Sequence, residues 1–596
     1  MKRITFLLLS VLSIQLYARE TTIFSVSGIY YKITSDINRT VEVTANTNSC
    51  ALYSGDIVIP DSVEYNGIYY KVTALGSRAF SLGTIRSLVL PLSLQTIGSE
   101  CFAGATLPEV ITLSDSLKEI KYAAFWATTG TNVVSIPAAT RIISERAFAD
   151  MYNLRQINVD TASIYYMSID GVMYSKDSTK LLACPRTKSG SFVIPYGVKY
   201  IESFAFESCS INTVEVPNTV TTIKNSAFSE CATLRTLHIP ASVTNIEGGA
   251  FRVCTNLTKL TVDSLNQNYT VVDKVLYSIN MDTLKNHSTA RDTVRVLEGV
   301  KVIDFDAFAG LSTMKYVILP ESVIKISEEA FISSNLRGIS LSPRLQEIRA
   351  YAFFGCTLLS GEIEIPNTVK EIGIGAFYGA GMDAVRMSDS VKVIPREAFA
   401  YCSNLDVYTG GASVERIEEY AFRSCGRFAK NIVFPPSLRV VEDVAFVFTD
   451  IETVEFTGVV DTIGQINLGD IEKLILVNTT PPYSNGKIAN SCDSIIIPCG
   501  ATQAYLSNSN WSSYSYIEDC DGIEENDPQS AVQVVAQHNS IDVYNAENYA
   551  VAIYDVMGRC HASESATGQS IRHYPLHTVG VYVVHINGKG YKVVVR

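Results

Sequence analysis

The chain has 596 residues, of which 47% are hydrophobic and 18% charged, and its formal net charge is −12. A chain of this length and composition buries a large core, which excludes general disorder. Nucleic acids and anionic membrane surfaces both require clustered lysine and arginine, and the sequence contains no basic run. The composition therefore predicts a large folded protein and disfavours both kinds of partner.

Residues 1–18 have the pattern of a secretory signal peptide. Lys2 and Arg3 precede an apolar run, and Ala18 provides a cleavage site. A transmembrane anchor is the alternative, but the apolar run is short for a bilayer. We expect a secreted or outer-surface protein with no membrane-spanning segment after signal removal.

Residues 19–56 are predicted to form an N-terminal cap. Ile29–Ile33 and Val41–Thr44 alternate as strands do, on either side of a turn-prone segment, and Gly67–Val72 repeats the theme. Because the end of a repeat array exposes an apolar cross-section, a hairpin is expected to cover it.

Residues 57–464 are built from a unit of about 23 residues. The stretch Thr213–Phe251 contains two turns, each reading hydrophobic–x–hydrophobic–Pro, then Val–x–x–Ile, then Ala-Phe, and often Cys. A fixed period of this length predicts a stacked solenoid, since one unit cannot bury its apolar face alone. The repeated phenylalanine stands at fourteen positions, most of them 22 to 24 residues apart: Phe80, Phe102, Phe125, Phe148, Phe206, Phe228, Phe251, Phe308, Phe331, Phe353, Phe377, Phe399, Phe422 and Phe446.

Each coil is predicted to contribute one strand to a parallel sheet. The alternating piece before Pro217 favours a strand, and Pro217 marks its end because proline cannot donate to a ladder. The piece Asn225–Cys231 has a polar start followed by Ala-Phe, which is typical of one short helical or 3₁₀ turn.

The pattern IP–x–x–V–x–x–I–x–x–x–AF–x–x–C resembles the BspA-like leucine-rich repeat family of surface proteins, over roughly residues 56–520. The resemblance implies secretion, surface display and macromolecular binding, with adhesion to host proteins for some members. The expected fold class is a β-rich solenoid of about 23-residue coils with short helical turns, followed by a small all-β sandwich-like domain.

Two insertions interrupt the array, near residues 160–190 and 263–290. Tyr165–Pro185 and Tyr269–His287 share an Asp–x–Val–x–Tyr–Ser core between two strand-like runs. Each is interpreted as a hairpin that projects from the side of the solenoid. The hairpins either carry binding, as loops on rigid scaffolds often do, or shield a bend, and the sequence leaves both open.

Residues 465–520 are predicted to cap the array, and residues 521–530 to form an acidic linker. Ile495–Trp511 resembles the terminal unit of BspA-like arrays, in which a strand ending in proline leads into a short helix. Tyr505 and Trp511 are expected to close the last core. Sugar stacking on Trp511 is the alternative role.

Residues 531–596 read as a separate module of alternating strands and turns, typical of a small β-sandwich. Ile553–Arg559, Gly580–Gly588 and Tyr591–Arg596 resemble the C-terminal sorting domain of type IX secretion cargo. The usual Pro-Asn-Pro opening is absent, so a retained structural domain is the alternative.

Six of the thirteen cysteines occupy the slot three residues after the repeat phenylalanine. An inward column holds small apolar side chains, so these are expected to be buried free thiols. A disulfide is expected instead among Cys492, Cys499 and Cys520, since the secreted compartment permits one. The six in the slot are Cys209, Cys231, Cys254, Cys356, Cys402 and Cys425.

No motif for catalysis, a metal or a cofactor stands out. Five of the seven histidines lie in the terminal module, and no histidine or cysteine pair has zinc-site spacing. The first candidates for a ligand face are the outward positions two residues before the repeat proline or its substitute. These are Val89, Thr112, Ser135, Val193, Glu215, His238, Ile318, Ser340, Glu364, Arg386, Val433 and Glu455.

This column of outward residues is chemically mixed, without the aromatic ladder that favours polysaccharide or the basic stripe that favours nucleic acid. This mixture is compatible with a protein partner and equally with an ordinary solvated sheet. The resemblance implies a secreted or cell-surface, adhesin-like binding protein that recognises host or bacterial macromolecules, with an extracellular protein or glycoprotein as partner; we expect it to be monomeric and not an enzyme. The alternatives are a carbohydrate-binding accessory of a glycan-utilisation system and, without any positive motif, a glycosidase or protease.

Overall fold

The computed structural model describes residues 22–45, 52–287, 292–428, 430–465 and 468–519, and, toward the C-terminus, 533–537, 540–544, 550–555, 560–565, 571–576, 580–586 and 589–595. The predicted signal peptide and linker lie outside these residues. The chain divides into two compact units, one of residues 1–429 and 445–449 and the other of residues 430–444 and 450–596.

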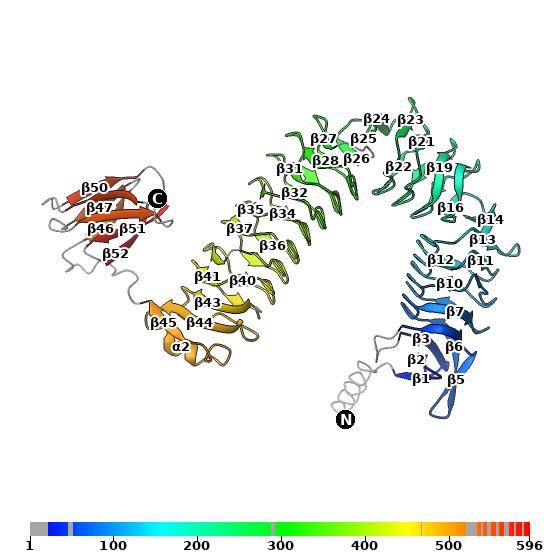
Figure 1. Ribbon diagram of the computed structural model, residues 1–596, viewed down its shortest axis with the longest axis horizontal. Helices are drawn as coiled ribbons and strands as arrows, with labels where there is room; N and C mark the ends of the chain where they lie inside the picture. Colours follow the sequence, from blue (N-terminus) through cyan, green and yellow to red (C-terminus); the bar gives the residue numbers. More distant parts are fainter. Residues whose placement is uncertain are drawn as a thin grey trace, which may run out of the picture. The chain divides into compact units, whose positions relative to one another are not determined.

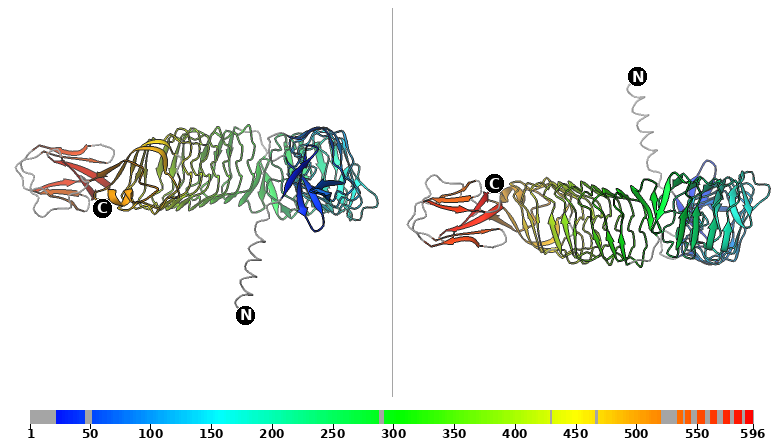
Figure 2. Two further views of the ribbon diagram at one scale, coloured as in Figure 1. Left: turned by 90° about the horizontal axis from the view of Figure 1, so that it is seen from below. Right: turned by 90° about the horizontal axis from the view of Figure 1, so that it is seen from above.

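Each coil contributes two strands, not one as predicted. The hydrophobic–x–hydrophobic piece forms the longer strand, and the Val–x–x–Ile piece forms a second strand of two residues. Within each sheet of the first unit, the longer strands pair in parallel with the longer strands of the neighbouring coils (Figures 1 and 2). They are β4 (Ser54–Val58), β7 (Thr84–Val89), β9 (Val110–Ile111), β11 (Val133–Ile136), β13 (Gln156–Val159), β17 (Ser189–Val193), β19 (Ser210–Glu215), β21 (Thr236–Ile239), β23 (Lys259–Val262), β27 (Thr293–Arg295), β29 (Tyr316–Ile318), β31 (Gly338–Ser340), β33 (Glu362–Glu364), β35 (Ala384–Met387) and β37 (Val407–Gly410).

The two-residue strands form a second parallel ladder on another side of the coils. Two residues are too few to give the alternation by which a strand is recognised, which is why the sequence pattern missed them. In the first unit they are β8 (Thr96–Ile97), β10 (Glu119–Ile120), β12 (Ile142–Ile143), β18 (Tyr200–Ile201), β20 (Thr222–Ile223), β22 (Asn245–Ile246), β28 (Val302–Ile303), β30 (Lys325–Ile326), β32 (Glu347–Ile348), β34 (Glu371–Ile372), β36 (Val393–Ile394) and β38 (Arg416–Ile417).

The Ala-Phe segment forms a turn rather than the predicted helical or 3₁₀ turn. In every coil the residues two before and two after the phenylalanine have positive φ, as Ser226 (53°) and Glu230 (60°) do around Phe228. A positive φ is incompatible with a right-handed helix. The backbone instead bonds to the next coil, since Phe228 N–H donates to the Ala250 carbonyl at 2.8 Å. We call this third side of the coils the turn stack.

The repeat phenylalanines form the core column that the sequence predicts. Phe206, Phe228 and Phe251 lie in successive coils with ring centroids 4.9 and 5.8 Å apart, and all three are buried. Offset stacking at this distance adds to the burial of apolar surface. One side chain per coil therefore fills the centre at the spacing that the backbone ladders impose.

The six cysteines of the repeat slot are buried free thiols, as predicted. All six also donate to a backbone carbonyl. The Cys231 thiol lies 2.9 Å from the carbonyl oxygen of Phe206, in the preceding coil, and Cys254, Cys356, Cys402 and Cys425 repeat the contact. Cys209 donates to the carbonyl of Cys184 at 3.3 Å. Burial raises the pKa of Cys356 to about 11. The slot therefore selects a small apolar residue that can also satisfy a carbonyl.

The two insertions are three-stranded antiparallel meanders. The first contains β14 (Tyr166–Ile169), β15 (Val172–Ser175) and β16 (Lys180–Ala183), and β16 then pairs in parallel with β18. The second contains β24 (Tyr269–Val272), β25 (Val275–Ser278) and β26 (Thr283–His287), and β26 pairs with β28 in the same way. The N-terminal strands β1 (Ile23–Val26), β2 (Ile29–Ser35) and β3 (Thr40–Thr44) have the same topology, since β3 pairs in parallel with β6 (Ile68–Leu75), the partner of the short strand β5 (Ser62–Tyr65).

The first meander lies between coils, so the expectation that it projects from the side is wrong. Its middle strand is buried on both faces: Met173 packs in the core of the preceding coils, whereas Val172 and Tyr174 pack in the core of the following coils. A layer that is apolar on both faces separates two stretches of coils. We therefore divide the coils of the first unit into block 1 (residues 22–159), block 2 (166–262) and block 3 (269–428). Blocks 2 and 3 each begin with a meander. We call the contact between the first meander and block 1 the first junction, and that between the second meander and block 2 the second junction.

The second unit contains further coils and the predicted helix. Its longer strands are β39 (Asn431–Phe434), β41 (Thr453–Phe456), β43 (Leu468–Ile475), β44 (Ala489–Pro498) and β45 (Tyr516–Asp519), and its short ones β40 (Val440–Val441) and β42 (Thr462–Ile463). Helix α2 (Thr502–Leu506) places Tyr505 against Trp511, with ring centroids 5.5 Å apart. Both side chains are fully buried, so they close the core as predicted, and sugar stacking on Trp511 is excluded.

The C-terminal module has two antiparallel sheets over a shared apolar core. Among the cysteines near the predicted cap, Cys499 is disulfide-bonded and Cys492 is a free thiol; Cys520 lies outside the described residues. The strands of the module are β46 (Gln533–Gln537), β47 (Ser540–Tyr544), β48 (Val551–Asp555), β49 (Cys560–Glu564), β50 (Ile571–Pro575), β51 (Gly580–Ile586) and β52 (Lys589–Val595).

Candidate functional site

The predicted ligand-face residues lie on or directly after the longer strands and point outward. Ten of the twelve are exposed, and only Ile318 and Glu455 are half-buried. Neighbouring members are register partners, as Val193 is with Glu215 and Ile318 with Ser340. The structure therefore places ten of these residues on outward strand positions of the first unit, and Val433 and Glu455 as register partners in the second unit. We call these twelve residues the strand column. Their role in ligand binding stays a prediction.

Polar contacts along the strand column run between neighbouring coils. Arg386 lies 3.7 Å from Glu364, its register partner, and both side chains are largely exposed. His238 Nδ1 lies 3.0 Å from the hydroxyl of Thr261 in the following coil. Exposed pairs of this kind contribute little to stability. These side chains can therefore leave one another and contact a ligand at little cost to the fold.

At each junction, a tyrosine hydroxyl takes the place of the next short strand as a hydrogen-bond partner. Tyr166 opens the first meander, and its hydroxyl accepts a hydrogen bond from Ile143 N–H at 3.0 Å. Tyr269 opens the second, and its hydroxyl accepts from Ile246 N–H at 2.7 Å. The bond from the phenylalanine N–H to the alanine carbonyl of the next coil has no equivalent at Phe148 or Phe251 among the described residues. The hydrogen bonds of the turn stack are thus interrupted at the two junctions.

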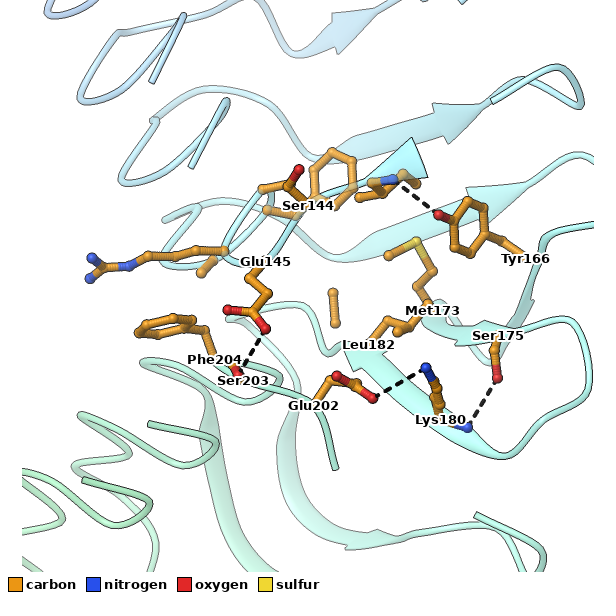
Figure 3. A pocket seen from close by; sticks show the side chains of 16 residues that line it. Ser144, Glu145, Tyr166, Met173, Ser175, Lys180, Leu182, Glu202, Ser203 and Phe204 are labelled. Atoms are coloured by element: carbon orange, nitrogen blue, oxygen red, sulfur yellow. Dashed lines mark hydrogen bonds and ion pairs between the residues drawn. The ribbon is translucent and has the colours of Figure 1, made fainter. Parts of the chain in front are cut away.

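A polar pocket of about 290 Å³ opens at the first junction (Figure 3). Ser144 and Glu145 line it from block 1, Tyr166 from the meander, and Glu202 and Ser203 from block 2. In Figure 3 the side chain of Glu145 points toward Ser203, whose hydroxyl lies 3.1 Å from Glu145 Oε1. Side chains of two blocks therefore meet in this pocket.

The charges of the pocket largely balance one another. Glu202 is 9% exposed, and its Oε2 accepts a hydrogen bond from Lys224. Its Oε1 is buried and accepts no hydrogen bond, and Lys180 Nζ lies 3.8 Å from it. The pocket can receive a small polar group. A second polar cavity, of about 260 Å³, lies beside the second meander.

The turn stack of the first junction carries a half-buried arginine, Arg146, whose charge is paired within the chain. The Arg146 guanidinium lies 4.5 Å from the ring centre of Trp126 and 4.9 Å from that of Phe204. It also donates from both Nε and a terminal nitrogen to the carboxylate of Glu207. This two-bond geometry is the strongest that arginine forms with a carboxylate.

A ladder of half-exposed aromatic rings lies on the turn stack of block 3. Phe354 and Tyr378 stack with centroids 4.8 Å apart, and Tyr378 is 5.0 Å from Tyr401. Tyr351 meets Phe354 edge-on. The Arg423 guanidinium lies 5.3 Å from the ring centre of Tyr401 and 5.1 Å from that of Tyr420. We call Tyr351, Phe354, Tyr378, Tyr401, Tyr420 and Arg423 the aromatic ladder.

The sequence prediction searched for aromatic residues on the strand column and so missed this surface. The rings stand one or two residues from the repeat phenylalanine, as in the YAFF of Tyr351–Phe354. Tyr351, Tyr401 and Tyr420 have positive φ, and the sequence alone does not show that their side chains leave the core. The available signal was the recurrence of tyrosine next to Ala-Phe between residues 351 and 423.

Among the described residues, no group of three or more histidine, cysteine or acidic side chains is placed to hold a metal ion. The two histidines of the described C-terminal strands that have acidic neighbours, His561 and His573, lie 3.0 and 2.5 Å from Asp555 and Asp542. No helix of the described chain has the length and apolar character needed to cross a bilayer.

Most of the coiled region matches a family model described as a BspA type leucine rich repeat region. Six copies of the model match, over residues 68–175, 183–292, 277–406, 361–475 and 409–492. The chain belongs to this BspA-type leucine-rich repeat family. Membership agrees with the resemblance in the sequence and with the solenoid of two-stranded coils. No curated protein matches the chain.

Solved structures with a similar chain include three bacterial proteins. A leucine rich cell surface protein of Faecalibacterium prausnitzii is 25% identical, with a TM-score of 0.35, over 66% of this chain and 95% of its own. A leucine-rich repeat protein of Eubacterium ventriosum is 20% identical, with a TM-score of 0.34, over 61% and 95%. The pneumococcal vaccine antigen PcpA is 15% identical, with a TM-score of 0.30, over 84% and 100%.

Proposed function

We propose that this BspA-type protein is a secreted or outer-surface binding protein that recognises an extracellular protein or glycoprotein and performs no catalysis. The observation that carries the proposal is the strand column: outward side chains of mixed chemistry repeat from coil to coil in register. A rigid array of this kind offers a long surface with little entropy to lose on binding. The predicted signal peptide is consistent with display outside the cell.

The test is binding of the purified full-length mature chain to immobilised matrix proteins, mucins and polysaccharides. A variant with Glu215→Ala and His238→Ala removes two neighbouring members of the strand column. The control carries Thr222→Ala and Asn245→Ala on the short strands of the same coils. We expect saturable binding to a protein, weakened about tenfold by the first variant and unchanged in the control. Selective binding to glycans, or no difference between the variants, contradicts the proposal.

We also propose that residues 531–596 direct export through type IX secretion. The sequence resemblance at Ile553–Arg559, Gly580–Gly588 and Tyr591–Arg596 supports this role. Removal of residues 531–596 is expected to abolish surface exposure, measured by protease accessibility on intact cells. Normal display of the shortened chain would mean that the module has a structural role instead.

A further inference from the structure

Arg423 differs from the other arginines that stack on aromatic rings in the described chain, because it lacks a carboxylate. Arg146 has Glu207, Arg186 has Asp150 and Arg396 has Glu397 and Glu419 within ion-pair distance. The described residues place no carboxylate at that distance from Arg423, and its buried Nε–H donates no hydrogen bond. Among the described residues, two tyrosine rings are therefore the only cation–π or ion-pair partners of this guanidinium.

The first junction shows what completes this arrangement. Arg146 lies between Trp126 and Phe204 much as Arg423 lies between Tyr401 and Tyr420. At the junction a glutamate carboxylate fills the remaining side of the guanidinium. Stacking fixes the plane of the guanidinium group and its fork of N–H donors, so little side-chain entropy is lost when a carboxylate binds it. The position at Arg423 has the same preorganisation without the carboxylate.

The rings of the aromatic ladder are arranged for a protein rather than for a sugar. Phe354 and Tyr378 are inclined by only 14° at 4.8 Å, so each covers a face of the other. Sugars stack on open ring faces, and the stacking of Phe354 on Tyr378 covers one face of each ring. Ring edges carry partial positive charge and attract oxygen atoms. Tyrosine and arginine are also the residue types most enriched in the centres of protein interfaces.

We propose that the aromatic ladder is a docking surface for an extended protein segment that presents an aspartate or glutamate to Arg423. The proposal rests on the binding role proposed above and names a second surface and the chemistry of its partner. Four coils at the measured ring spacing span about 15 Å, the length of an extended segment of about five residues. The carboxylate completes the guanidinium fork, and the neighbouring side chains lie along the ring edges.

The experiment uses a phage-displayed library of random 12-residue peptides selected on the full-length mature protein. We expect the enriched peptides to share an acidic residue. Synthetic versions are expected to bind the Arg423→Gln variant about tenfold or more weakly than the wild type. The matched control is Arg396→Gln, because Arg396 stacks on the same ladder but has its own glutamates. Binding to this control is expected to fall by less than about threefold.

Three further measurements separate the outcomes. Replacing the acidic residue of the peptide with its amide is expected to weaken binding to the wild type but not to Arg423→Gln. Arg423→Lys keeps the charge but not the fork, so intermediate affinity is expected, and circular dichroism and thermal melting verify that each variant is folded. Enrichment without acidic residues, equal binding to Arg423→Gln, or Arg423-dependent binding of polygalacturonate in place of peptides overturns the proposal. Undiminished binding of Arg423→Gln to a partner from the immobilised panel would overturn this inference and leave the proposed function standing.

Discussion

The first junction and block 3 both place an arginine among aromatic rings on the turn stack, but for opposite purposes. At the junction, Trp126, Arg146 and Phe204 are completed by Glu207, so the arrangement is closed within the chain. In block 3, Arg423 and its two tyrosines have aromatic neighbours but no carboxylate among the described residues. The difference shows that outward side chains of the turn stack form either a closed contact between blocks or an exposed surface. Which of the two they form depends on one acidic side chain.

The largest expected effect separates the interior of a block from its end. Phe228→Ala is expected to lower the free energy of unfolding by about 3–5 kcal/mol, because it opens a cavity between two stacked rings. Phe148 ends the stack of block 1, with Phe125 as its ring neighbour. Phe148→Ala is expected to cost about 1 kcal/mol less. Urea unfolding checks both, and an unchanged midpoint for Phe228→Ala would contradict the core assignment.

The second junction is expected to be less stable than the first at neutral pH. Arg252 Nε and Asp306 Oδ1 lie 3.5 Å apart, and both atoms are buried without a hydrogen bond. Burial raises the pKa of Asp306 to about 7, against the opposing attraction of Arg252. The folded state therefore binds more protons than the unfolded state between about pH 4 and pH 7, and stability falls as pH rises through this window.

The matched variant for this prediction is Asp306→Asn. It cannot ionise, so its stability should exceed that of the wild type by up to about 4 kcal/mol above pH 7 and lose most of that advantage near pH 4. Thermal melting of both proteins from pH 4 to pH 8 provides the measurement. Parallel pH profiles would show that Asp306 does not titrate in this window.

At the first junction, loss of the carboxylate is expected to be costly. Glu207→Gln preserves the shape of the side chain but leaves Arg146 as an uncompensated, mostly buried charge. We expect a loss of about 3 kcal/mol in the free energy of unfolding. Denaturant unfolding with intrinsic fluorescence follows the change, because Trp126 lies against Arg146. A loss below about 1 kcal/mol would remove the distinction between closed and open arginines.

The smallest expected effect is that of Arg423→Gln on stability. No ion pair is lost among the described residues, so only the contacts with two partly exposed tyrosine rings disappear. We expect a change of about 1 kcal/mol or less. Comparison of its melting temperature with that of Glu207→Gln measures the contrast directly. Equal losses in the two variants would mean that Arg423 also serves the fold.

The sequence predicted the features that repeat. The period, the phenylalanine column and the free thiols of the cysteine slot all recur in phase, and the structure confirms each of them. It did not predict the short strand of each coil, because Thr222–Ile223 is too brief to show an alternation. Nor did it predict the turn around Phe228. Ser226 and Glu230 adopt positive φ there although neither is a glycine, so the sequence carries no signal for this turn.

The sequence by itself determined the solenoid, because apolar residues at a fixed period can be buried only by stacking one coil on the next. The tertiary structure alone decided where the stack is interrupted and which side chains remain available. Met173 and Tyr174 are adjacent in the chain yet enter different cores. Arg146 and Glu207 meet across 61 residues, whereas Arg423 has no such counterpart in the described chain. Such pairings depend on distances between coils, which a one-dimensional pattern does not contain.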